Sequence, residues 1–397
     1  MLQSQRRGFR AFALGLTAVF LVAGCSANLT DPAPGASESG SDEGPIKIGA
    51  VLDITGAGAT LGVPQQNTLK MLADQLTASG GIDGREVELI IRDNQSAEDT
   101  AARETTKLIE QDGVDLLIGS SRTGPSLAMR PIAEQNTVPT ISLAANAAIV
   151  DGSEWLFKTA QNDIVVLEAL LDDAEASGHE SLALVRDASA FGEGIADFIT
   201  ELGQSRGITL VDQESFEPDA TDFTAQMTKI RSSDADAVLI WGVNPAAGLA
   251  QKSYVQLDVG KPVYQSHGIA NASFFEQAGD SANGAVVPQG RLLVADQIPA
   301  DDPQKQVIDD YVSAYEDAYG EAPNAFGGYA FDAWNIAIDA LSTVGTDPIE
   351  LRDQIMDVSD YRGVSGVFSF TPENRSGLGA GSIVMTVAEN STWKLKG

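Results

Sequence analysis

The fold is decided by residues 46–92, which read IKIGAVLDITGAGATLGVPQQNTLKMLADQLTASGGIDGREVELIIR. The apolar run at 46–52 leads into a loop rich in glycine, then a stretch with helical periodicity, then a second apolar run at 86–92. Short apolar runs separated by helix-type stretches recur along the chain. Strands and helices that alternate in this way indicate parallel sheets covered by helices on both faces.

The same alternation predicts the remaining elements. Further strands are expected at residues 114–119, 139–143, 181–187, 208–216, 235–242 and 262–266, with late strands at 366–370, 382–388 and 392–396. Helices are expected at residues 97–112, 304–319, 325–343 and 348–356. The first of these helices is predicted to be capped by Ser96 together with Asp99.

The strand count predicts two lobes, because one sheet with so many strands would be unusually wide. The rhythm is interrupted near Thr159 by WLFKTAQND, and again at residues 288–304. We therefore expect the chain to divide near these points.

The N-terminus predicts export. Arg6, Arg7 and Arg10 precede an uncharged apolar run at 11–23, which as a helix would span about 20 Å and cannot cross a hydrocarbon core of about 30 Å. Residues 1–24 are therefore predicted to be a cleaved signal peptide.

Cys25 is the only cysteine, so an intrachain disulfide is excluded. Ala23 and Gly24 directly before it resemble the lipobox of bacterial lipoproteins. That resemblance implies a lipid on the Cys25 sulfur and a membrane anchor on the extracytoplasmic face. The alternative is an ordinary signal peptide with an incidental cysteine. Residues 25–45, rich in Ser, Pro, Gly and acid, are expected to form a lipidated flexible tether.

The charge is strongly acidic, with 25 basic and 56 acidic residues and a net charge of -31. The predicted signal peptide removes three basic residues and no acid, which leaves 22 minus 56, or -34. Nucleic acid binding needs Lys and Arg to displace counterions from phosphates, so no nucleic acid partner is expected. An acidic surface of this kind favours solubility.

The glycine loop does not match a nucleotide site. Gly56, Gly58 and Gly62 are spaced G-x-G-x-x-x-G, so the third glycine is expected to miss the position where a helix packs closely on a strand. No Gly-Lys-Ser or Gly-Lys-Thr occurs. No cofactor is therefore expected.

Catalytic patterns are also missing from the sequence. His179 and His267 are the only histidines, neither H-E-x-x-H nor G-x-S-x-G occurs, and no thiol exists beyond Cys25. We expect no catalytic residue, no metal site and no enzyme activity. Binding is the function class that remains.

Several motifs together resemble the leucine/isoleucine/valine-type periplasmic binding proteins over residues 45–397. Beside the opening stretch they are LIGSSRTGPSLA (117–128), FGEGIADF (191–198) and GIANASFFEQAG (268–279). The resemblance implies an α/β, two-lobed type I fold, in which each lobe is a parallel sheet flanked by helices and three hinge crossovers join the lobes. It also implies a monomer that delivers a small carboxylate ligand to the permease subunits of an ABC importer.

The resemblance and the interruptions set the expected lobes. The first lobe is predicted at residues 46–160 plus 291–364, and the second at 161–290 plus 365–397. In the first lobe, the family's carboxylate contacts match Thr123 and Gly124. Pro125 suits the first turn of a helix, whose free N–H groups and dipole favour an anion.

Further expected ligand contacts carry over from the family. After the fourth strand they are Ala144, Ala145 and Asn146, whose small side chains let main-chain N–H groups approach an anion. Leu61 is expected in the opening loop, whose glycines would form a mobile pocket wall. The remaining contacts are Phe191, Val243, Asn244, His267 and Tyr329.

His267 departs from the family pattern. The amino-acid binders carry an acid there to pair the α-ammonium of the ligand, and a histidine cannot supply that charge. QSHGIAN (265–271) is also similar to the branch that takes up aromatic acids such as benzoate. We therefore expect a carboxylate without an amino group. An amino acid stays open, since Asp187 offers another acid, and so does a sensor that signals to a membrane receptor without transport.

Overall fold

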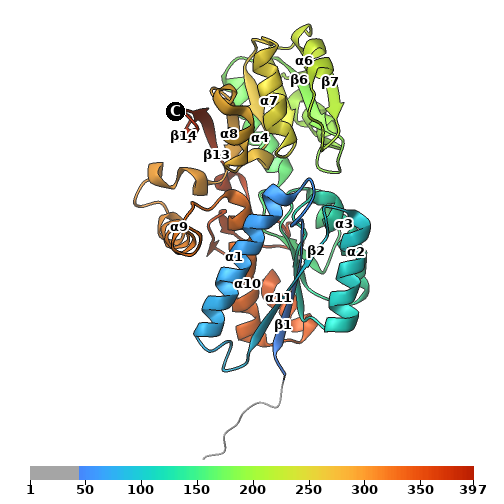
Figure 1. Cartoon of the computed structure of the whole chain (residues 1–397), viewed down its shortest axis with the longest axis vertical. Coiled ribbons are helices and arrows are strands. Elements are labelled where there is room, and N and C mark those ends of the chain that lie inside the picture. Colours follow the sequence, from blue (N-terminus) through green and yellow to red (C-terminus); the bar gives the residue numbers. More distant parts are fainter. Residues whose placement is uncertain (1–43) are drawn as a thin grey trace, which may run out of the picture. The chain divides into compact units, whose positions relative to one another are not determined.

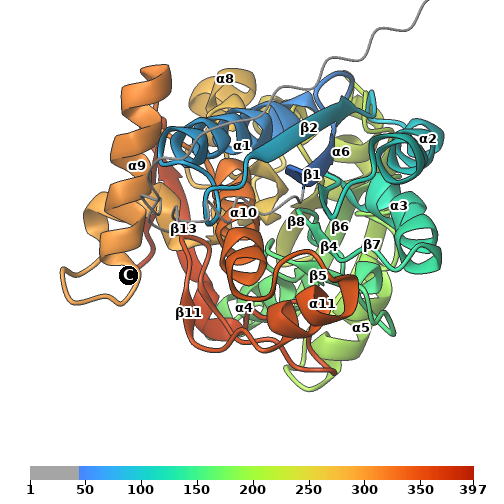
Figure 2. The same cartoon turned by 90° about the horizontal axis from the view of Figure 1, so that it is seen from below.

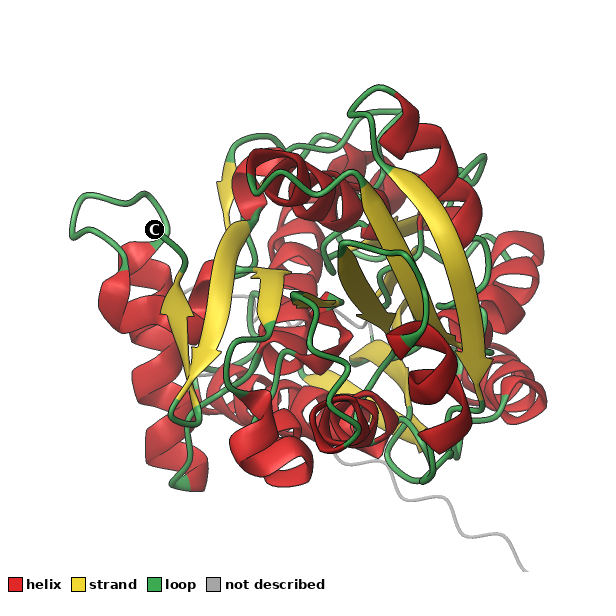
Figure 3. Ribbon diagram, turned by 90° about the horizontal axis from the view of Figure 1, so that it is seen from above, coloured by secondary structure: helices red, strands yellow, loops and turns green. Residues whose placement is uncertain are grey.

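The computed structural model describes residues 44–397, which form two main sheets enclosed by helices (Figure 3). The predicted signal peptide, the Cys25 lipidation site and nearly all of the tether lie outside the described residues. Within residues 44–397, no helix has the length and apolar character needed to cross a membrane.

The first sheet is wholly parallel, with strand order β2-β1-β3-β4-β5. Its strands are β1 (Ile46–Leu52), β2 (Val87–Asp93), β3 (Leu116–Gly119), β4 (Thr140–Ser142) and β5 (Leu156–Lys158). All four residues of β3 are buried, as expected for an inner strand covered on both faces.

The second sheet has strand order β14-β13-β10-β9-β8-β6-β7. Its parallel strands are β6 (Ser181–Asp187), β7 (Thr209–Phe216), β8 (Ala237–Trp241), β9 (Val263–Gln265) and β10 (Val286–Gln289). Two antiparallel strands, β13 (Val384–Glu389) and β14 (Thr392–Leu395), extend it beyond β10. A separate two-stranded sheet joins β11 (Tyr361–Arg362) to β12 (Val367–Phe368).

The helices separate by sheet (Figure 1). Beside the first sheet lie α1 (Ala59–Ala78), α2 (Glu98–Lys107), α3 (Thr123–Gln135), α10 (Ala325–Val344) and α11 (Pro348–Met356). Beside the second lie α4 (Asp163–Ala176), α5 (Ile195–Gln204), α6 (Thr224–Arg231), α7 (Ala246–Gln256) and α8 (Ser273–Ala278). The helix α9 (Lys305–Tyr319) precedes α10. Figure 2 shows α1 and α10 side by side, in agreement with their contacts.

The chain passes between the two sheets three times. It leaves the first sheet after Lys158, returns to the side of α1 with α10, and re-enters the second sheet at Val384. The fold is thus the two-lobed α/β arrangement expected from the sequence. The residue limits of the lobes given above stay a prediction.

The sequence reasoning missed two strands of the main sheets, and also the two-residue strand β11 of the small sheet. The stretch taken as an interruption near Thr159 contains β5, and β10 overlaps the start of the second interruption. Both strands have only three or four residues, which is too short for an alternating pattern to show. Conversely, the strand expected at 366–370 is reduced to Val367–Phe368.

The predicted capping box at Ser96 is wrong. The helix α2 begins at Glu98 after Ala97, and no side chain caps it. The Ser96 hydroxyl instead donates to the carbonyl of Thr55 (2.7 Å) and accepts from the N–H of Gly58 (2.8 Å). Ser96 therefore fixes the loop that leads into α1.

Gly62 also differs from the expectation. It lies inside α1, and a Cβ placed there would come within 2.2 Å of the main-chain oxygen of Asp53. The absent side chain lets α1 approach the end of β1, so close packing occurs at this glycine after all. Leu61 likewise belongs to the first turn of α1 and not to a loop.

Candidate ligand-binding site

A cavity opens at the carboxyl ends of the parallel strands of the two sheets, the edge where open α/β sheets bind ligands. It encloses about 630 Å³, a figure that includes space open to solvent. From the first sheet's side it is lined by residues 121–125 and 143–145, and from the second's by residues 189–191, Val243 and His267.

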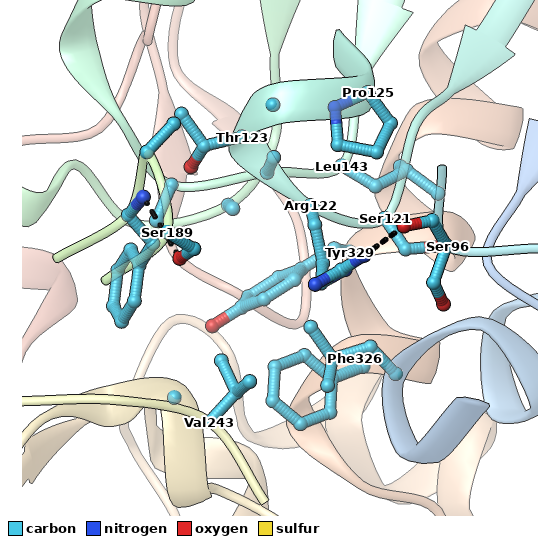
Figure 4. Close-up of a pocket in the computed structure, with 18 of the residues that line it drawn as sticks. Ser96, Ser121, Arg122, Thr123, Pro125, Leu143, Ser189, Val243, Phe326 and Tyr329 are labelled. Atoms are coloured by element: carbon cyan, nitrogen blue, oxygen red, sulfur yellow. Dashed lines mark hydrogen bonds between the residues drawn. The ribbon is translucent and has the colours of Figure 1, made fainter. Parts of the chain in front are cut away.

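The start of α3 supplies hydrogen-bond donors to the cavity. The main-chain N–H groups of Thr123 and Gly124 have no acceptor among residues 44–397, as is normal for a first helical turn. Pro125 occupies the same turn, where its missing N–H is no loss. Figure 4 shows Thr123 and Pro125 at the cavity wall. An anion placed here would meet the positive end of the helix dipole.

Arg122 lies directly before this helix, in extended conformation. Its Nε donates to Asp53 (2.6 Å), and its Nη2 donates to the carbonyl of Ser96. Asp53 is fully buried and also accepts from Asn94 (2.7 Å) and Ser120 (2.8 Å). The guanidinium is therefore fixed at the cavity wall by a buried network (Figure 4).

The loop after β4 is held in place by hydrogen bonds with Lys158 and Asp163. The carbonyl of Ala145 accepts from Lys158 Nζ and from the N–H of Asp163 (3.3 Å). The Asp163 carboxylate accepts from the N–H of Ala147 (3.2 Å). The N–H of Ala145 itself has no acceptor within the described part of the chain, and Ala145 is one of the residues that line the cavity.

Lys158 and Asp163 titrate under opposing influences. Complete burial lowers the pKa of Lys158 to about 8, against the attraction of Asp163. Burial raises the pKa of Asp163, against the positive charge of Lys158. Lys158 is thus a cationic side chain with no exposed surface, close behind the cavity.

An aromatic cluster forms the wall from the second lobe. The ring of Phe191 stacks on Trp241, with centroids 5.3 Å apart, and meets His267 edge-on at 5.7 Å. His267 is only 2% exposed, and neither ring nitrogen has a well-aligned hydrogen-bond partner in residues 44–397. Burial, helped by the charge of Lys158 and opposed by the main chain of Gln161, lowers the pKa of His267 to about 3. The imidazole is therefore neutral at neutral pH.

Asp187 is the last residue of β6 and is bonded to Ser189 in the loop that follows. One of its oxygens accepts from the N–H (3.1 Å) and the hydroxyl (2.6 Å) of Ser189, while Oδ2 is buried without a partner among residues 44–397. Burial raises the pKa of Asp187 to about 6, against its hydrogen bonds to Ser189 and the charge of Arg122. Asp187 is not among the residues that line the cavity.

The first turns of α10 add aromatic surface. Asn324 caps this helix by accepting from the N–H groups of Phe326 and Gly327, both at 3.1 Å. The cap places Phe326 and Tyr329 at the cavity, where Figure 4 shows the ring and hydroxyl of Tyr329 directed inward. Burial raises the pKa of the Tyr329 hydroxyl, which is therefore a neutral donor.

Most of the predicted contact residues converge on this cavity. Those that line it are Leu61, Thr123, Gly124, Ala144, Ala145, Phe191, Val243, His267 and Tyr329. Asn146 and Asn244 do not. The side chain of Asn146 caps the short helix that follows it, by accepting from the N–H of Ala148. The side chain of Asn244 donates to Asn271 (2.9 Å).

Other lining residues were missed. They are Ser96, Glu98, Ser121, Arg122, Pro125, Leu143, Ala160, Ser189, Ala190, Gly268 and Phe326. Several are immediate neighbours of predicted contacts, so a wider window around each motif would have found them. Arg122 had a further signal, a lone basic side chain at the start of an anion-favouring helix. Within residues 44–397, no group of three or more His, Cys, Asp or Glu side chains is arranged to hold a metal ion.

The chain is similar to known binding proteins. It is 25% identical over 244 residues to the Leu/Ile/Val-binding protein BraC3 of Rhizobium johnstonii, a match that covers 61% of this chain and 66% of that protein. An extracellular ligand-binding receptor from Rhodopseudomonas palustris HaA2 superposes with a TM-score of 0.84 and 29% identity, over 89% of this chain and 100% of that one.

A second solved structure is the branched-chain amino acid transporter substrate binding protein LivJ from Streptococcus pneumoniae, in complex with isoleucine. It superposes with a TM-score of 0.79 and 26% identity, over 88% of this chain and 98% of that one. Residues 45–391 match the sequence family described as Periplasmic binding protein. The chain, with its two lobes and the cavity between them, therefore belongs to the periplasmic binding protein family.

Proposed function

We propose that this protein captures a small carboxylic acid without an amino group, of the aromatic-acid type, and delivers it to the permease of an ABC importer. The observation that carries the proposal is the state of His267. By the family resemblance, amino-acid binders carry an acid at this position, whereas His267 is a buried, neutral imidazole whose pKa is lowered by burial and by the charge of Lys158. A ligand ammonium beside His267 would meet a neutral ring there, which is unfavourable, because the one acid that lines the cavity, Glu98, lies against Gly124 in the first lobe.

The first-lobe wall suits the carboxylate of such a ligand. The N–H groups of Thr123, Gly124 and Ala145 have no acceptors within residues 44–397, and all three residues line the cavity. The Thr123 hydroxyl and the Arg122 guanidinium lie on the same wall. Donors already held in place lose little entropy when a carboxylate binds.

The rest of the cavity suits an apolar, flat group. Phe191, Phe326 and Tyr329 contribute rings, and Leu61 and Val243 contribute aliphatic surface. Aromatic side chains favour offset-stacked or edge-to-face contact with another ring.

A branched-chain amino acid is the second candidate. The unpartnered Oδ2 of Asp187 favours it, because a buried carboxylate oxygen without a partner would be stabilised by a ligand ammonium. The isoleucine bound by the Streptococcus pneumoniae relative points the same way.

The proposal places the protein on the extracytoplasmic face of the membrane, held by a lipid on Cys25. Mass spectrometry of the protein from its native host tests the anchor, and an unmodified Cys25 would contradict it. Genes for a permease and an ATPase beside the coding gene support import. Their absence favours the alternative of a ligand sensor.

Isothermal titration calorimetry distinguishes the two ligand classes. We expect benzoate or a related aromatic acid to bind with micromolar affinity, about -8 kcal/mol, and L-leucine to give no heat. Binding of leucine without binding of any aromatic acid would overturn the proposal in favour of the amino-acid candidate. A thermal-shift screen of acids, amides and amino acids is the efficient first step, because a ligand of the folded state raises the melting temperature.

Thr123→Ala tests the position of the carboxylate. Loss of the hydroxyl should weaken binding of the acid by about 1 to 3 kcal/mol and leave the melting temperature of the ligand-free protein nearly unchanged. The matched control is Thr200→Ala, because the exposed Thr200 hydroxyl bonds only to the carbonyl of Ala196 within its own helix. Unchanged affinity in Thr123→Ala would remove Thr123 from the site.

A further inference from the structure

Lys158 is a buried cation that the ligand contacts described above do not use. It ends β5, and its side chain has no exposed surface. Its Nζ donates to the carbonyl of Ala145. An ammonium carries three N–H donors, and this is the only hydrogen bond that Nζ makes within residues 44–397.

The ammonium also lacks a direct counter-ion. No carboxylate of the described chain lies within 4.0 Å of Lys158 Nζ, although Asp163 is near enough to stabilise its charge. The Asp163 carboxylate itself accepts from the N–H groups of Ala147 (3.2 Å) and Ile164 (3.0 Å). A buried cation without a paired anion is unfavourable. A further negative charge near Lys158 would therefore be stabilised by it.

Lys158 bonds to one residue of the cavity wall, and its charge influences the titration of a second. Ala145, whose carbonyl it holds, is one lining residue, and His267 is another. Burial and, to a smaller extent, the charge of Lys158 lower the pKa of His267. The low dielectric of a buried site makes such an influence stronger than it would be in water.

We propose that Lys158 is a specificity-determining residue, which holds the Ala144–Ala145 loop in position and supplies from behind it the positive charge that selects an anionic ligand. Lys158 does not touch the ligand. It favours a carboxylate over a neutral amide of the same shape, and it disfavours a ligand ammonium near His267. This inference rests on the proposed function.

The test separates charge from position with three variants. Lys158→Gln keeps an N–H donor for the Ala145 carbonyl and removes the charge. Lys158→Met removes both, and Lys158→Arg keeps both. The matched control is Lys261→Gln, because Lys261 also donates to a main-chain carbonyl, that of Ala235 (2.7 Å), and does not line the cavity.

Calorimetry with benzoate and benzamide gives the first readout. For Lys158→Gln we expect benzoate affinity to fall at least about tenfold and benzamide affinity to change less than about twofold, while Lys158→Arg keeps the parent's preference. An equal loss for both ligands, or no loss for either, overturns the role of Lys158. If the parent protein binds leucine and no aromatic acid, the proposed function itself fails, which is a different result.

A ligand-free readout guards against variants that fold poorly. The chain has only two histidines, so NMR resolves the titration of His267. Removal of the Lys158 charge should raise the pKa of His267 in Lys158→Gln and Lys158→Met, but not in Lys158→Arg or Lys261→Gln. An unmoved His267 titration in a folded Lys158→Met protein contradicts the proposed electrostatic influence on the cavity.

Discussion

The hydroxyl of Thr60 donates a hydrogen bond to the main-chain carbonyl of Asn244, 3.1 Å away, and so joins the first turn of α1 to the loop after β8. The side chain of Asn271 donates in turn to the carbonyl of Thr60 (3.2 Å) and accepts from the side chain of Asn244 (2.9 Å). These three residues form a closed ring of hydrogen bonds between the lobes. Leu61, which follows Thr60, and Val243, which precedes Asn244, both line the cavity.

Thr60→Val should therefore weaken the closed, ligand-bound state. Valine keeps the shape of threonine and removes its hydroxyl, and a net hydrogen bond is worth about 0.5 to 1.5 kcal/mol. We expect benzoate affinity to fall about 2- to 12-fold, mainly through faster dissociation. Stopped-flow binding and small-angle scattering check this. Thr200→Val is the control, and an unaltered dissociation rate in Thr60→Val would show that the ring does not hold the lobes together.

Asp53→Asn should destabilise the fold. Asp53 is fully buried and receives hydrogen bonds from Arg122, Asn94 and Ser120. The side-chain amide of asparagine would place its own N–H donors next to these donors and would remove the negative charge. Removal of one partner of a buried ion pair costs about 3 to 5 kcal/mol, measurable by urea unfolding. The control is Asp172→Asn. The Asp172 side chain pairs with Arg206 and is 64% exposed, so the free energy of unfolding should change by less than about 1 kcal/mol. Equal effects of the two substitutions would argue against a buried network.

His267 should make the protein sensitive to acid. Its pKa is about 3 in the folded protein against 6.5 in the free side chain, so between these values the unfolded chain binds more protons. The stability that neutral His267 contributes is then fully present above pH 6.5 and is lost as the pH falls toward 3.

The measurement compares His267→Gln with the parent. The free energy of unfolding of the parent should fall relative to that of the variant as the pH is lowered from 7 to 4. His179→Gln, which removes the other histidine, is the matched control. A parent and a His267→Gln variant with parallel pH profiles would refute the burial of a neutral imidazole.

Gly62→Ala should destabilise the protein, although alanine normally favours a helix over glycine by about 1 kcal/mol. The added Cβ would come within 2.2 Å of the Asp53 carbonyl oxygen, so α1 would have to shift away from β1. Overpacking of this kind costs about 1 to 3 kcal/mol. Gly379→Ala is the control, since nothing lies within 4 Å of its Cβ position. A raised melting temperature for Gly62→Ala would contradict the close approach.

The sequence predicted the fold where the pattern was long enough to read. Strands such as β1 and β6, with seven residues each, were located correctly because their apolar runs are bounded by turn residues. The strand β5 was not, because three residues give no period. Lys158 lies in that strand, inside a stretch that looked like an interruption, and a lysine there suggests exposure by composition alone.

The candidate site was predicted in outline for a similar reason. Motifs at strand ends placed Thr123 and His267 on the cavity, since parallel strands bring their carboxyl ends to one edge. The hydrogen-bond network around Arg122 could not be predicted from the sequence. Its partner Asp53 is 69 positions away in the chain and becomes a neighbour only when β1 pairs with β3.

The antiparallel strands β13 and β14 have a consequence for biosynthesis. β10 is an inner strand only because β13 pairs with it, and Trp393 of β14 stacks on Phe274 with ring centroids 5.6 Å apart. Until β13 and β14 have emerged, the nascent chain presents an open β edge and an uncovered aromatic ring, both of which promote aggregation. Loss of β13 and β14 should therefore leave the protein prone to misassembly, although every ligand-lining side chain would still be present.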